Sequence, residues 1–120
     1  MFLISVVDDD HSVRESLQGL LQSIGYTVET FCTAQAFLDS DCLERTDCLI
    51  LDVRMPGIPG PELQQTLVQR GSGIPIVFIT AHGDEEVRLR VLADGAVDCL
   101  LKPFSEDALL TAIRAALPPN

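Results

Sequence analysis

The fold is decided by FLISVVDDD at residues 2–10, an apolar run that stops at three adjacent carboxylates, Asp8, Asp9 and Asp10. A second apolar run, CLILD at residues 48–52, ends in the same way at Asp52. Carboxylates rarely end buried strands without a use, because burying an unpaired charge is costly. Two such strand ends would gather several acids into an oxygen-rich site. That site suits Mg²⁺, which takes one or two carboxylates together with waters and phosphate oxygens.

Strand-like and helix-like segments alternate five times along the chain. Apolar runs predict strands at 2–7, 26–31, 47–52, 75–79 and 97–101, and helical periodicity predicts helices at 11–24, 34–39, 61–70, 84–93 and 106–117. The alternation predicts an α/β fold, a doubly wound parallel sheet of five strands with helices on both faces. The run 26–31 mixes polar and apolar residues and is expected at an edge, whereas three runs that are apolar on both faces are expected in the centre.

Local signals predict where helices begin and end. Ser12 and Glu15 have the spacing of a capping box at the start of the first helix. Gly25 is expected to end that helix, and Pro61 fits the first position of the third helix.

Length and composition indicate a single domain, residues 1–117, followed by a tail or linker at 118–120. Hydrophobic residues make up 47% of the chain, enough for a core that needs no disulfide bonds or structural metal. The net charge of -10 argues against direct nucleic-acid contact by this domain. No apolar run approaches the roughly 20 residues that span a bilayer. The start of the chain lacks the features of a signal peptide, so we expect a soluble, cytoplasmic protein without membrane contact.

Four cysteines are present, Cys32, Cys42, Cys48 and Cys99, and no two have C-x-x-C spacing. Zinc binding by these cysteines is therefore not expected, and a chain of this size does not need a disulfide framework. We therefore expect them to be small buried apolar residues.

The remaining strand ends also carry polar residues. The fourth strand leads into Thr80, and the fifth leads into Lys102. In open α/β sheets ligands bind outside the carboxyl ends of the strands, so these groups should meet the acids there. A carboxylate can accept a phosphoryl group, and a cation, a lysine and a hydroxyl can neutralise the phosphoryl oxygens. The set Asp9, Asp52, Thr80 and Lys102 contains each of these parts.

Four motifs in this order resemble the response-regulator receiver family over nearly the whole chain. They are VDDD at 7–10, LDVRMPGIPG at 51–60, FITAH at 78–82 and LKPF at 101–104. The pieces DVRMP at 52–56 and GAVD at 95–98 are similar to the FixJ-like subgroup, whose members usually carry a DNA-binding domain after the receiver. The resemblance implies a flavodoxin-like fold with strand order 2-1-3-4-5.

The resemblance also implies a role for each site residue. Asp52 would accept the phosphoryl group from a phosphohistidine on a sensor histidine kinase. Mg²⁺ would be held by Asp9 directly, by Asp8 largely through water, by Asp52 and by the backbone carbonyl of Arg54. Lys102 would pair with the phosphoryl oxygens and Thr80 would move toward them to begin the switch. Pro103 would follow a cis peptide bond.

The family's output face implies a homodimer, formed on phosphorylation, through the fourth helix, fifth strand and fifth helix. The chain departs from the family at Cys99, because an aromatic ring that moves behind the switching Thr80 usually stands there. Two residues keep alternatives open: Asp10 as a third metal ligand or a favourable first-turn acid, and His82 as a base, a metal ligand or a solvated loop residue.

Three other functions fit these residues less well than a phosphorylation switch. A haloacid-dehalogenase-like phosphatase needs a second Asp two residues after its nucleophile, where this chain has Arg54. A flavodoxin-like electron carrier needs a phosphate loop after the first strand, where acids would repel a flavin phosphate. A docking module that is never phosphorylated would not need the complete set of Asp, Thr and Lys.

Overall fold

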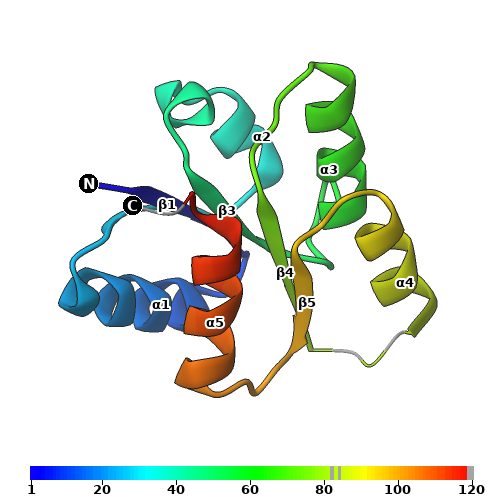
Figure 1. Cartoon of the computed structure of the whole chain (residues 1–120). Helices are drawn as coiled ribbons and strands as arrows, with labels where there is room; N and C mark the ends of the chain where they lie inside the picture. Colours follow the sequence, from blue (N-terminus) through cyan, green and yellow to red (C-terminus); the bar gives the residue numbers. More distant parts are fainter. Residues whose placement is uncertain (82, 84, 119–120) are drawn as a thin grey trace.

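The computed structural model describes residues 1–81, 83 and 85–118, which form a five-stranded parallel sheet covered by helices on both faces (Figure 1). The strands are β1 (Leu3–Val7), β2 (Thr27–Phe31), β3 (Cys48–Asp52), β4 (Ile76–Thr80) and β5 (Asp98–Leu101). The helices are α1 (His11–Ile24), α2 (Ala34–Leu38), α3 (Gly60–Gln69), α4 (Glu85–Ala93) and α5 (Glu106–Ala116). All ten predicted elements are confirmed, with ends that differ by about one residue. The short 3₁₀ helix η1 (Asp41–Glu44) was not predicted.

The strand order is β2-β1-β3-β4-β5, as the family resemblance implied. Every pair is parallel, and the register places Val7 beside both Phe31 and Leu51, and Asp52 beside Ile79. β1, β3 and β4 are buried along their whole length, whereas β2 has exposed residues and lies at an edge. The central strands therefore bring their carboxyl ends together in the middle of one edge of the sheet.

Side chains of the central strands alternate between two cores, one on each face of the sheet. Leu49, Leu51 and Phe78 point into the core under α2, α3 and α4. Ile50 and Val77 point into the core under α1 and α5. Figure 1 shows α1 and α5 together on one side of the sheet and α2 and α3 on the other. Because a strand has a side-chain period of two, each central strand packs against helices on both faces of the sheet.

Two signals predicted at helix starts differ by one or two positions in the structure, although α1 begins at residue 11 as predicted. Asp10, not Ser12, caps α1: its carboxylate accepts a hydrogen bond from the Ser12 N–H at 2.9 Å. The helix begins directly after the third acid, so the capping-box spacing from Ser12 falls inside the first turn. α3 begins at Gly60 after Pro59, which puts Pro61 in the second position. Gly25 ends α1 with φ 110°, as predicted.

The cysteines are free, and three of them are buried as predicted. Cys32 is exposed, because it follows the edge strand β2 and lies outside both cores. Burial raises the pKa of the Cys48 thiol to about 12, so this group is an inert core residue. None of the helices formed by the described residues combines the length and the apolar character that crossing a bilayer requires.

Candidate functional site

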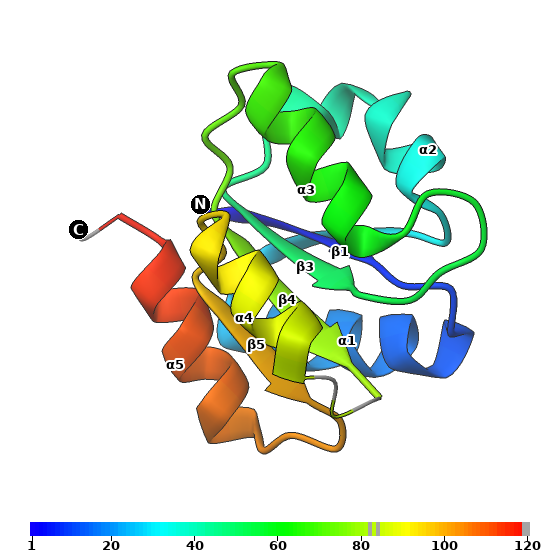
Figure 2. The same ribbon diagram turned by 90° about the vertical axis from the view of Figure 1, so that its right-hand side faces the viewer.

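Five of the seven predicted site residues lie along the edge where the strands end, which we call the rim. Figure 2 shows the arrowheads of β3, β4 and β5 pointing toward the same end of the molecule. Asp8 and Asp9 follow β1, Asp52 and Thr80 close β3 and β4, and Lys102 follows β5. The prediction that these segments converge is therefore confirmed.

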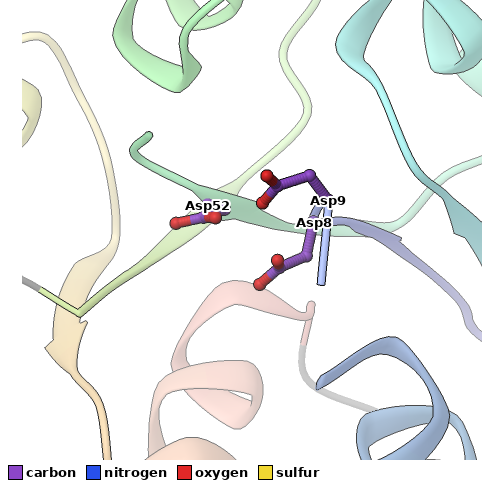
Figure 3. Close-up of side chains that lie close together, drawn as sticks. All are labelled: Asp8, Asp9 and Asp52. Atoms are coloured by element: carbon purple, nitrogen blue, oxygen red, sulfur yellow. The ribbon is translucent and has the colours of Figure 1, made fainter. Parts of the chain in front are cut away.

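Three carboxylates, those of Asp8, Asp9 and Asp52, share one space at the rim (Figure 3). One oxygen from each lies within 4.8 Å of the others. Asp8 and Asp52 are buried, whereas Asp9 is exposed. The group has only oxygen ligands and one side open to solvent, and both properties suit a hard divalent cation that keeps part of its water. Asp10 is not a member of this group, because its carboxylate caps α1.

Asp8 is fully buried, and every one of its polar groups has a partner. Its N–H donates to the Phe31 carbonyl at 3.1 Å, and its Oδ1 accepts from the Asp10 N–H at 2.9 Å. Its Oδ2 accepts from Lys102 Nζ at 3.0 Å, and its carbonyl accepts from Arg14 Nη1 at 2.8 Å. This carboxylate is therefore fixed in direction, and it takes part in the site without free rotation.

Lys102 links two of the acids. Its ammonium is 3.0 Å from Asp8 Oδ2 and 4.0 Å from Asp52 Oδ2, so the closer pair is with Asp8. The Lys102 N–H also donates to the Thr80 carbonyl at 2.7 Å, which ties the end of β5 to the end of β4. The peptide bond to Pro103 is cis, as predicted.

Asp52 has an unusual electrostatic environment. Burial and the neighbouring Asp8 carboxylate raise its pKa from 3.8 to about 7, although Lys102 and the Arg54 N–H act in the opposite direction. The Arg54 N–H lies 3.4 Å from Asp52 Oδ1. Without a further positive charge, the three acids therefore repel one another, and the site is short of cationic charge.

Gly60 is a site residue that the sequence indicated only as the last position of the motif at 51–60. A Cβ at this position would collide with the main-chain carbonyl of Asp52 and lie 3.1 Å from the Phe78 ring. The Gly60 N–H donates to the Val53 carbonyl at 3.0 Å. The start of α3 therefore packs directly behind Asp52, which only a residue without a side chain permits.

The two predicted switch residues are buried on neighbouring strands. Thr80 closes β4, and Cys99 lies on β5 beside Phe78, two residues earlier on β4. Cys99 belongs to the core under α4, together with Val91 of that helix. The prediction for His82 falls outside the described residues.

Comparison with known proteins gives one consistent family. The model of the response regulator receiver domain matches residues 4–114. The response regulator protein TodT of Pseudomonas putida is 47% identical over 115 residues, which are 96% of this chain and 51% of TodT. The transcriptional regulatory protein FixJ of Bradyrhizobium diazoefficiens is 43% identical over 114 residues, 95% of this chain and 56% of FixJ.

Solved structures show the same likeness in three dimensions. The structure of the response regulator StyR superposes with a TM-score of 0.89 at 53% identity, and the match covers 96% of this chain and 58% of StyR. The chain thus spans about half the length of the curated relatives it matches.

Proposed function

This chain belongs to the response regulator receiver domain family, and we propose that it is a phosphorylation switch with Asp52 as the phosphoacceptor. Family membership removes the phosphatase and electron-carrier alternatives. The observation that carries the proposal is the charge of the rim: three carboxylates within 4.8 Å and a pKa of about 7 at Asp52. Such a site gains most from binding a cation, and phosphoryl transfer needs a cation to neutralise the phosphoryl oxygens.

In the proposed reaction, one Asp52 oxygen attacks the phosphorus of a phosphohistidine on a sensor histidine kinase. A P–O bond forms as the P–N bond breaks, and the electron pair of the P–N bond leaves with the imidazole nitrogen, which takes up a proton. Lys102 Nζ, 4.0 Å from Asp52 Oδ2, can turn from Asp8 to a phosphoryl oxygen. We place this exchange in the cytoplasm, as the family resemblance implies.

Mg²⁺ is the cation we propose for the rim. Asp9, Asp52 and the Arg54 carbonyl would hold it, with Asp8 acting largely through water. When bound, Mg²⁺ supplies positive charge to the phosphoryl oxygens. Asp9 is suited to direct coordination because its carboxylate is exposed, whereas Asp8 already accepts two hydrogen bonds.

The proposed switch runs from Thr80 to helix α4. Thr80 would move toward the phosphoryl group, and the small side chain of Cys99 leaves the space behind it without a ring. Among the described residues of α4, Val91 is the fully buried one, and Gln64 Nε2 donates to its carbonyl at 3.0 Å. Because one fully buried side chain of α4 packs into the core, this helix can shift at a small energetic cost.

We propose that the switch acts on a partner, because the chain spans only about half the length of its relatives. We propose a transcription-regulating output domain as the target, with DNA contact made by that domain and not by this acidic one. Phosphorylation would pair two copies through α4, β5 and α5. Leu89 on α4 and Leu101 on β5 are 56% and 53% exposed. Arg88 on α4 and Asp98 on β5 give the same face mixed charge, which can pair across a symmetric interface.

Light scattering before and after treatment with a small phosphodonor tests the dimer. We expect a shift from monomer to dimer that Leu89→Lys abolishes without preventing phosphorylation. A wild-type protein that stays monomeric under both conditions contradicts this part of the proposal.

A titration with Mg²⁺ tests the site itself. Because a ligand that binds only the folded state stabilises it, the melting temperature should rise with Mg²⁺ at millimolar-order concentration. Asp9→Ala should lose most of that rise, whereas Asp94→Ala, at an exposed position after α4, should keep it. A wild-type melting temperature that does not respond would contradict the proposed metal site.

A further inference from the structure

Arg14 is a basic side chain of α1 that reaches back to the acidic loop after β1. It lies in the first turns of α1, and its Nη1 donates to the Asp8 carbonyl at 2.8 Å. Helical side chains lean toward the N-terminus of their helix, so a long residue here can return to the strand end from which the chain came. The contact thus closes the segment 8–14 on itself.

The Asp8 carbonyl needs such a partner from outside the helix ladder. Asp10 is the N-cap, and its own carbonyl accepts from the Arg14 N–H at 3.1 Å, as the first helical bond. The carbonyl of Asp8 lies two residues before the cap, where no helical N–H is available. Since Asp8 is fully buried, a carbonyl left without a donor there would be costly.

We propose that Arg14 is a positioning residue for the metal ligands Asp8 and Asp9, an inference that rests on the function proposed above. Lys102 occupies a carboxylate oxygen of Asp8, whereas the Arg14 contact is to the main chain and leaves the carboxylate oxygens of Asp8 to other partners. The second guanidinium nitrogen, Nη2, lies 3.5 Å from His11 Nδ1, and His11 Nε2 lies 3.3 Å from Glu15. His11 therefore lies beside the guanidinium group, and Glu15 contacts the far side of the His11 ring.

The expected effect of removing Arg14 on Mg²⁺ affinity has opposite signs, depending on whether Arg14 acts through its charge or by orienting the ligands. If only its charge mattered, its removal would lower the positive potential beside the acids and strengthen Mg²⁺ binding. If it orients the ligands, its removal must weaken binding, because residues that orient metal ligands typically change metal affinity by about 10–100-fold. The direction of the change therefore separates the two explanations.

The test compares Mg²⁺ affinity, measured by calorimetry, in three variants. Arg14→Met keeps the length of the side chain without its donors, and should weaken Mg²⁺ binding by about tenfold. Arg14→Lys restores a donor and should recover most of that loss. The control Arg114→Met removes the same charge from the exposed last turn of α5. Affinity in Arg14→Met that equals or exceeds the control would overturn the proposal.

Amide hydrogen exchange without metal gives an independent readout. In Arg14→Met, the N–H groups of Asp8 and Asp10 should exchange faster, while that of Val6 in β1 keeps its wild-type protection. Unchanged exchange at Asp8 and Asp10 would overturn the proposal whatever the metal does. If wild-type protein binds no Mg²⁺, the proposed function fails, and the exchange comparison still decides whether Arg14 orders the loop.

Discussion

Replacing Asp52 by Asn should stabilise the metal-free protein, although it removes the proposed phosphoacceptor. The fold holds the Asp52 carboxyl with a pKa of about 7, compared with an ordinary value of 3.8. At about 1.4 kcal/mol per tenfold change in proton affinity, ionising this group within the fold costs about 4 kcal/mol. Asn keeps the shape without the charge, but Lys102 then loses one of its two carboxylate neighbours. We expect a net gain of about 2–4 kcal/mol at pH 8.

The pH dependence follows from the direction of the pKa change. Because the folded protein binds this proton more tightly than the unfolded chain, the stability of the wild type falls as the pH rises from about 4 to about 7. Above pH 7 the full penalty is present, and below pH 4 it is absent. The difference between wild type and Asp52→Asn should therefore be large at pH 8 and close to zero near pH 4.

Urea unfolding without divalent cations measures this difference. Asp94→Asn, at an exposed position, is the matched control and should change stability by no more than about 0.5 kcal/mol at either pH. Adding Mg²⁺ at pH 8 should stabilise the wild type more than the Asn variant and so narrow the gap. An Asn variant that is no more stable than wild type at pH 8 would refute the argument that the rim is short of positive charge.

Three further substitutions test other parts of the site. Lys102→Ala should still gain phosphoryl mass with Mg²⁺ but lose dimerisation in light scattering, since the ammonium proposed to pair with the phosphoryl oxygens is gone; an unchanged dimer would remove Lys102 from the proposed mechanism. Gly60→Ala should destabilise the protein by about 1–3 kcal/mol in urea, because its Cβ meets the Asp52 carbonyl, whereas Gly19→Ala, in open space on α1, should be neutral or stabilising; equal effects would contradict the packing. Cys99→Tyr should widen the difference in dimer fraction between the phosphorylated and unphosphorylated states, because a ring would then block the proposed inward movement of Thr80. An unchanged difference in dimer fraction would mean that Cys99 does not limit the link between phosphorylation and dimerisation.

The strands, and the convergence of their carboxyl ends, could be predicted because both follow from local sequence patterns. β1, β3 and β4 are almost wholly apolar and buried, and each leads into a polar residue at the rim. The order of the strands came from the family resemblance, since alternation alone does not fix which strands are neighbours.

Contacts between distant segments could not be predicted from such patterns. The close approach of Gly60 to the Asp52 carbonyl depends on the path of the loop after β3, and the bond from Arg14 to the Asp8 carbonyl depends on the angle at which α1 leaves β1. The assignment of the cap to Ser12 failed for a related reason. Three adjacent acids offer several competing caps, and only the backbone decides which of them is used. Cys32 is exposed because it follows the end of the edge strand β2, where none of the described helices or strands covers it.

Intact mass after incubation with Mg²⁺ and a small phosphodonor tests the central claim most directly. Wild-type protein should gain the mass of one phosphoryl group, mapped to Asp52, and the gain should disappear when Mg²⁺ is chelated. Asp52→Asn should gain nothing under the same conditions, whereas Asp94→Asn should gain as much as wild type. A wild-type protein that gains no mass, or an Asp52→Asn variant that still gains it, would contradict the assignment of Asp52 as phosphoacceptor.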